Sequence, residues 1–208
     1  MIRLQVEAGR WTVTLDRPDK ANALTAAMLE DLERILGEAH QAAAHALVLT
    51  GTGKVFSAGA DLEEARAGLA TSPLWERVSG ALARLPCLKV AALNGTLAGG
   101  AFGMALACDL RLAVPGANFF YPVMRLGFLP QPSDPARLAA LVGPARAKMI
   151  LMAGAKITAE EALGWGLVDR IAAPEALLAE AAALTEAACA APAGHVAAIG
   201  RFFADPAR

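Results

Sequence analysis

The sequence has few of the residues that mark disulfide-stabilised, metal-binding or nucleic-acid-binding proteins. Its three cysteines, Cys87, Cys108 and Cys189, are odd in number and widely spaced, which favours reduced thiols over a disulfide framework. The three histidines are scattered without metal-ligand spacing, so no metal site is expected. Acidic and basic residues nearly cancel, 20 against 19, and no basic block stands out. We therefore expect no nucleic-acid partner.

Long uninterrupted apolar runs are also missing. The chain is 56% hydrophobic, but every stretch of about 18 residues contains a charge or a helix breaker, so no membrane-spanning segment is predicted. The first ten residues contain no apolar core of a signal peptide. These features predict a cytoplasmic protein, and the length of 208 residues suits a single domain.

Strand-like and helix-like segments alternate along the chain and predict an α/β domain with a helix-rich last third. Alternating or continuously apolar runs predict strands at 2–6, 11–15, 46–50, 90–93, 110–114, 118–121 and 167–171. Apolar residues at helical spacing predict helices at 25–41, 73–85, 136–141, 144–152, 158–164, 174–190 and 192–203. Residues 61–72 are expected to form a loop with one weak helical turn.

Two turns made of small residues follow buried strands. In the first, Ser57-Ala58-Gly59-Ala60 comes after the strand at 46–50. In the second, Ala98-Gly99-Gly100-Ala101 comes between the strand at 90–93 and an apolar helix. Small side chains let a ligand oxygen approach backbone N–H groups closely. The pair predicts an oxyanion hole, and the alternative is that both are simply tight turns with close packing.

Two short segments share features with nucleotide-binding patterns. Gly51-Thr52-Gly53-Lys54 has the lysine of a phosphate-binding loop, but Val55 follows where serine or threonine is needed. The second turn lies between a strand and a helix, as in a dinucleotide-binding fold, but Ala98 replaces the first glycine. Neither pattern is complete, so neither nucleotide hydrolysis nor a dinucleotide-dependent oxidoreductase is the favoured interpretation.

The chain resembles the crotonase, or enoyl-CoA hydratase/isomerase, superfamily, with motifs in the family's order and spacing. The matching segments are residues 15–24, 48–62, 91–109, 127–130, 141–147 and 161–169. The resemblance implies a spiral of ββα units over about residues 1–142 and a shortened helical part over about 143–208. It also implies an acyl-CoA thioester as substrate, no permanently bound cofactor, and a homotrimer or hexamer.

The resemblance also implies the site residues. The oxyanion donors of the family fall on the backbone N–H groups of Ala58 and Gly100. The coenzyme A pocket is expected to include Lys20, Asn22, Ala23, Ala58, Ala60, Asp61, Leu62, Gly99 and Gly100. Arg17 or Lys20 is a candidate for contact with the phosphates, and the alternative for both is an exposed loop charge.

The positions that hold catalytic carboxylates in the family hold other residues in this chain. The two positions where hydratases have glutamates are Gly103 and Val123 here, and the aspartate position of other members is Gln131. None of these side chains transfers a proton as a carboxylate does. Asp134 is a candidate acid or base displaced along the same loop, with helix N-capping as the alternative. The sole tyrosine, Tyr121, is expected to pack rather than to face the acyl pocket.

The resemblance therefore implies a protein that binds an acyl-CoA thioester and stabilises a thioester enolate through an oxyanion hole. Standard hydration needs an acid and a base that this chain lacks at the usual positions, so decarboxylation or isomerisation is favoured. The alternative is a non-catalytic subunit that binds coenzyme A esters or assists assembly.

Overall fold

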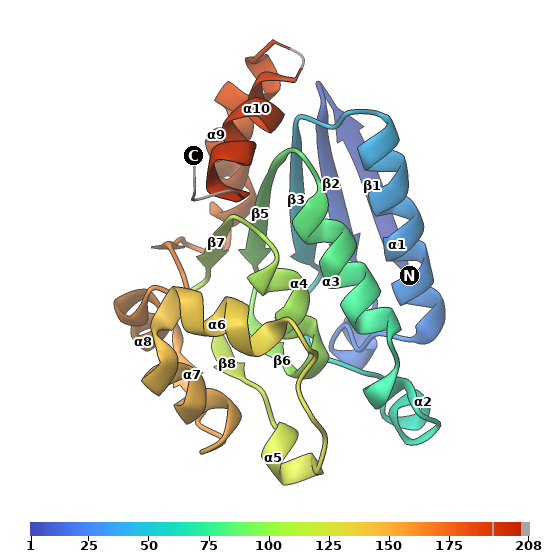
Figure 1. Ribbon diagram of the computed structural model, residues 1–208, viewed down its shortest axis with the longest axis vertical. Coiled ribbons are helices and arrows are strands. Elements are labelled where there is room, and N and C mark those ends of the chain that lie inside the picture. Colours follow the sequence, from blue (N-terminus) through green and yellow to red (C-terminus); the bar gives the residue numbers. More distant parts are fainter. Residues whose placement is uncertain (193, 205–208) are drawn as a thin grey trace.

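The computed structural model describes residues 1–192 and 194–204, and two sheets organise them (Figure 1). The larger sheet has the strand order β1-β2-β3-β5-β7-β10, with only the β1–β2 pair antiparallel. Its strands are β1 (Ile2–Glu7), β2 (Arg10–Leu15), β3 (Ala46–Gly51), β5 (Leu88–Leu93), β7 (Leu110–Ala113) and β10 (Arg170–Ile171). The smaller sheet, in the order β4-β6-β8-β9, comprises β4 (Val55–Ser57), β6 (Thr96–Ala98), β8 (Asn118–Phe120) and β9 (Ile157–Thr158).

Helices pack around these sheets and close one hydrophobic core. They are α1 (Ala26–Gln41), α2 (Leu62–Arg66), α3 (Leu74–Arg84), α4 (Phe102–Leu106), α5 (Val123–Leu126), α6 (Asp134–Val142), α7 (Pro144–Leu151), α8 (Ala159–Trp165), α9 (Leu177–Ala190) and α10 (His195–Ala204). Short 3-10 turns lie at η1 (Pro18–Lys20), η2 (Leu69–Thr71) and η3 (Gly99–Ala101). Helices α1 and α3 lie side by side, and α9 packs on β3, β5 and β7 (Figure 1). Strands β3 and β5 are almost continuously apolar because neighbouring strands and helices bury both their faces.

The two sheets alternate along the chain in a regular way. Strand β3 of the large sheet is followed by β4 of the small sheet, β5 by β6, and β7 by β8, and each pair precedes helical segments. This repetition is the predicted spiral of ββα units. It brings the carboxyl ends of β4, β6 and β8 together, because these three strands are parallel neighbours.

Most predicted elements are present, and the differences fall on short segments. Thr25 caps α1 as predicted, since its side chain accepts a hydrogen bond from the Met28 N–H. The predicted strand at 167–171 pairs only at Arg170–Ile171. Strands β4, β6 and β9 and helix α5 were not predicted, because segments of two to four residues carry too little periodicity to recognise.

Among the described residues, no single helix is long and apolar enough to cross a membrane. The bent pair formed by α9 and α10 satisfies the length and composition criteria only when the two helices are taken together.

Candidate active site

A cavity of about 140 Å³ lies at the carboxyl ends of the three parallel strands of the small sheet. The residues directly after β4, β6 and β8 contribute to its wall, and α5 with the loop after it supplies apolar side chains. Its lining includes Ala58, Ala60, Gly99, Gly100, Tyr121 and Phe128. Ligand sites commonly lie at this edge of parallel sheets, where several turns converge.

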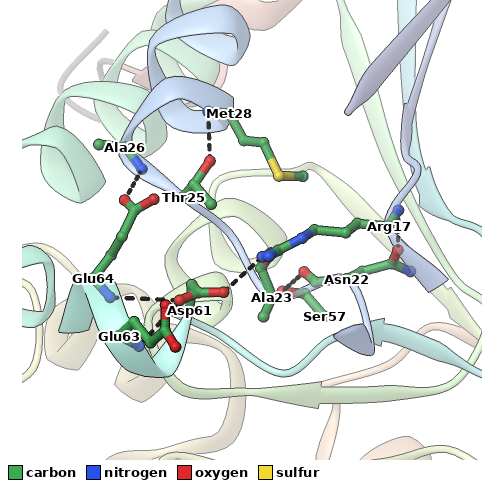
Figure 2. Close-up of polar contacts among 10 residues, drawn as sticks. All are labelled: Arg17, Asn22, Ala23, Thr25, Ala26, Met28, Ser57, Asp61, Glu63 and Glu64. Carbon is green, nitrogen blue, oxygen red and sulfur yellow. Dashed lines mark hydrogen bonds and ion pairs between the residues drawn. The ribbon is translucent and has the colours of Figure 1, made fainter. Parts of the chain in front are cut away.

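Asn22 holds the first of these turns in place. Its side chain is fully buried, accepts a hydrogen bond from the Arg17 N–H at 2.8 Å, and donates to the carbonyls of Thr52 and Val55 at 2.9 and 2.7 Å. The Ser57 hydroxyl donates to the Asn22 carbonyl at 2.9 Å (Figure 2). Every polar atom of this amide side chain therefore has a partner in the fold. A contact between the Asn22 segment and coenzyme A stays a prediction.

Helix α2 begins at the end of the same turn. Asp61 caps it by accepting from the Glu63 and Glu64 N–H groups at 3.0 and 3.4 Å, and pairs with the Arg17 guanidinium at 2.8 Å (Figure 2). The hydrogen bond from Arg17 is the main reason that the pKa of Asp61 lies below its ordinary value. The Arg17 guanidinium, a candidate for contact with the phosphates, is thus paired with the Asp61 carboxylate in this structure.

The Ala58 N–H does not point to the cavity. It donates to the Ala21 carbonyl at 3.0 Å, so the prediction that it serves as an oxyanion donor is wrong for this structure. Ala60 forms a parallel bridge with Leu24, in which Leu24 N–H donates to Gly59 and Asp61 N–H donates to Leu24. In such a bridge the N–H of the central residue points away from the partner strand. Ala60 is also in the cavity wall, so its N–H is the better candidate donor.

The second turn packs directly against the first. A Cβ added to Gly59 would lie 3.1 Å from the Ala98 carbonyl oxygen and 3.5 Å from the Gly100 nitrogen, so only glycine lets the two backbones approach this closely. Gly59 and Gly99 also have positive φ angles of 92° and 58°. The ring of Trp75 packs against Gly100, where an added Cβ would lie 3.0 Å from it.

Tyr121 follows β8 at the third strand end and connects the cavity to a buried carboxylate. Its hydroxyl donates to Asp134 Oδ2 at 2.9 Å, and its ring stacks on Phe102 with centroids 5.5 Å apart. The ring packs as predicted, but it also lines the cavity, so the expectation that it would not face the pocket is wrong. Asp134 itself is fully buried, and its Oδ1 has no hydrogen-bond partner among the described residues.

The Asp134 carboxylate fills the space beside Gly103. A Cβ added to Gly103 would lie 2.8 Å from Asp134 Oδ1 and 3.3 Å from Oδ2. Burial raises the pKa of Asp134 to about 7, although the Tyr121 hydroxyl and Arg137 oppose this rise. The carboxyl thus titrates near neutral pH, as groups that exchange protons commonly do.

The start of α6 is fixed from α3. The Glu76 carboxylate accepts hydrogen bonds from the Ser133 N–H, at 3.2 Å, and from the Ser133 hydroxyl. Ser133 is the N-cap position of α6, and Asp134 is the first residue of the helix. The predicted alternative, that Asp134 acts as the N-cap, is therefore wrong, because its side chain turns inward to Tyr121.

The cavity contains some of the predicted site residues and not others. Ala58, Ala60, Leu62, Gly99 and Gly100 line it. Lys20 lies exposed on η1, Ala23 is buried with its carbonyl bound to Arg17, and Asn22 and Asp61 have the structural contacts given above. Among the described residues, no group of three histidine, cysteine, aspartate or glutamate side chains is placed to hold a metal ion.

Sequence reasoning missed part of the wall. Trp75, Leu126, Phe128 and Leu129 all line the cavity. Leu129 is 86% exposed and Leu126 55% exposed, which is unusual for leucine. Leu129 lies within the matching segment 127–130 and Leu126 directly before it, but their orientation depends on the short helix α5, which was not predicted.

Comparison with known proteins identifies the family to which this chain belongs. The model of the family described as enoyl-CoA hydratase/isomerase matches residues 5–208. This chain belongs to that family. A Bacillus subtilis relative named as an enoyl-CoA hydratase/isomerase is 39% identical over 182 residues, which cover 84% of this chain and 70% of the relative. A Mycobacterium tuberculosis relative named as an enoyl-CoA hydratase is 38% identical over 161 residues, or 77% of this chain and 66% of the relative.

Solved structures agree with this assignment. The crystal structure of an enoyl-CoA hydratase from Bacillus anthracis matches with a TM-score of 0.91 and 30% identity, over 98% of this chain and 82% of that one. The chain thus spans about two thirds of the length of its curated relatives and somewhat more of its structural ones.

Proposed function

We propose that this protein binds an acyl-CoA thioester in the cavity and stabilises the thioester enolate with the backbone N–H groups of Ala60 and Gly100. The observation that carries the proposal is the contact between the two small-residue turns, whose residues share one cavity wall. Gly100 lies in the first helical turn of the η3–α4 segment, where N–H groups lack intrahelical acceptors. Donors aimed at a developing oxyanion are a large source of catalytic stabilisation.

The proposed reaction is an isomerisation or a decarboxylation rather than standard hydration. Gly103 and Val123 offer no acid or base next to the cavity, so a water molecule has no paired carboxylates to activate it there. Both favoured reactions pass through an enolate and need a single proton to be moved. The relatives named as hydratases support the thioester class of substrate. The trimeric or hexameric assembly and the cytoplasmic location stay predictions.

Exchange of the α-protons of butyryl-CoA with D2O tests enolate formation directly, because exchange needs no commitment to a final product. Ala60→Pro removes the proposed donor N–H, whereas Ala60→Ser retains it with a small side chain. Loss of one such donor is expected to slow exchange by a factor of about 10² to 10³. Ala60→Ser should stay close to wild type, and thermal unfolding monitors whether each variant is folded.

The outcomes separate the proposal from its rival. The non-catalytic alternative predicts binding of butyryl-CoA by calorimetry without exchange, and without release of CO2 from malonyl-CoA. Exchange that is equally fast in the proline variant would remove the Ala60 N–H from the oxyanion hole.

A further inference from the structure

Tyr121 spans the distance between the cavity and the buried Asp134 carboxylate. Its side chain lines the cavity, and its hydroxyl donates to Asp134 Oδ2 at 2.9 Å. Stacking on Phe102 fixes the plane of the ring, and the Gln131 N–H donates weakly to the phenol oxygen at 3.4 Å. The phenol oxygen therefore has a fixed position and a lone pair left over.

Folding alone gives no reason for the Asp134 carboxylate to be where it is. It is fully buried, and Oδ1 has no partner among the described residues. A buried carboxylate without full hydrogen bonding destabilises the fold, and such groups are often retained for chemistry. The charged and titratable groups that influence it are Tyr121 after β8, Glu76 on α3 and Arg137 on α6.

Tyr121 is also the only residue in the cavity wall whose side chain carries a titratable proton, among the residues that the structure describes. The rest of the wall is apolar or small apart from the Gln131 amide. A proton exchanged between a ligand in this cavity and a titratable side chain of the described wall would therefore involve Tyr121.

We infer that Tyr121 and Asp134 form a two-residue proton relay that moves one proton between the α-carbon of the bound thioester and the Asp134 carboxylate. This inference rests on the proposed function, because it presumes an acyl thioester in the cavity. Tyr121 is the catalytic residue in contact with substrate, and Asp134 acts through it.

The relay balances without any further reactant. In the forward step the α C–H bond breaks, its proton binds the Tyr121 oxygen, and the Tyr121 O–H proton passes to Asp134 Oδ2. The electron pair of the C–H bond forms the enolate, whose oxygen is held by the backbone donors. The reverse transfers return one proton to the α-carbon or to the γ-carbon of an unsaturated chain.

This stoichiometry points to a substrate class. A relay that removes and returns one proton suits the double-bond shift of an unsaturated acyl thioester. The apolar side chains of Leu126, Phe128 and Leu129 in the cavity wall suit a hydrocarbon acyl chain rather than a charged one. The structure thus favours isomerisation among the reactions proposed above.

The test compares α-proton exchange of butyryl-CoA in wild type, Tyr121→Phe and Asp134→Asn, with Asp31→Asn as the control for loss of an exposed carboxylate. We expect Tyr121→Phe and Asp134→Asn each to slow exchange by a factor of about 10² to 10⁴. Calorimetric affinity for butyryl-CoA should stay within about threefold of wild type in all variants. The exchange rate of wild type should rise with pH through an inflection near 7, and Asp134→Asn should lack that inflection.

The inference and the proposed function fail in different ways. If Tyr121→Phe exchanges within about threefold of wild type, the relay is overturned while the oxyanion hole stands. If wild type binds butyryl-CoA without any exchange, the relay and the enolate proposal both fall. Should Tyr121→Phe not fold, the isosteric Asp134→Asn variant and the wild-type pH profile decide the same question, and an unchanged profile in Asp134→Asn would overturn the relay.

Discussion

Two buried polar side chains beside the cavity, Asn22 and Asp134, have opposite hydrogen-bonding states. Both are 0% exposed. The Asn22 side chain uses both amide hydrogens and its oxygen within the fold, with three partners between 2.7 and 2.9 Å. Asp134 has one partner on Oδ2 and none on Oδ1 among the described residues. A buried polar group with all its hydrogen bonds formed stabilises the structure, whereas one with a hydrogen-bonding atom left unpaired calls for another explanation, such as a catalytic role.

The same contrast separates the two ends of the cavity. At the first turn, the Asn22 and Ser57 side chains are bound to backbone carbonyls, and Asp61 is paired with Arg17 (Figure 2). At the third strand end, the Tyr121 hydroxyl donates a hydrogen bond to the Asp134 carboxylate near the cavity. The protein thus combines a rigid backbone site with a titratable pair.

The largest expected effect is on the pH dependence of stability. The folded pKa of Asp134 is raised from 3.8 to about 7, so the folded state retains a proton that the unfolded state loses between these values. Stability therefore falls as pH rises through this window, by up to about 4 kcal/mol from this group. Asp134→Asn mimics the neutral form and should be more stable than wild type by a few kcal/mol at about pH 8, with little difference at about pH 4.

Urea unfolding at both pH values measures this effect. Asp31→Asn controls for the loss of one exposed carboxylate. It should not change the difference in unfolding free energy between the two pH values by more than about 0.5 kcal/mol. An Asp134→Asn variant that is destabilised equally at both pH values would show that Asp134 is a structural group like Asn22.

The second effect concerns Asn22 itself. Asn22→Ala removes three hydrogen bonds and leaves the Thr52 and Val55 carbonyls without this donor, and we expect a loss of about 3 kcal/mol in the free energy of unfolding. Asn118→Ala, which removes only a contact with the nearby Gly116 carbonyl, is the matched control and should cost less than about 0.5 kcal/mol. A small loss at Asn22 would mean that the first turn does not depend on this network.

The smallest predicted effect is that of a substitution at Gly103. Gly103→Ala places a Cβ 2.8 Å from Asp134 Oδ1, so the carboxylate must move and its contact with Tyr121 must change. We expect a stability loss of about 1–2 kcal/mol and slower α-proton exchange. Gly164→Ala, in helix α8 with open space around it, should instead be neutral or stabilising by up to about 1 kcal/mol. Unchanged exchange in Gly103→Ala would argue that Asp134 need not stay where it is.

The sequence alone determined the family, most of the long elements and the two small-residue turns. Periodicity and capping specify segments such as α1 and β3 locally, and the motifs of the turns consist of adjacent residues. The sequence also identified Asp134 as a candidate acid or base, because a carboxylate in that loop can be recognised without knowing which way its side chain points.

Only the tertiary structure decided which atoms of these motifs face the cavity. The Ala58 N–H is bound to Ala21, 37 positions away, and the Asn22 side chain is bound to residues 30 and 33 positions away, which no local pattern reveals. The contact between Tyr121 and Asp134, and the space beside Gly103 that holds the carboxylate, arise when β8, α4 and α6 pack together. The direction of a hydrogen bond and the burial of a charge depend on neighbours that are distant in sequence, so packing decides which groups face the cavity.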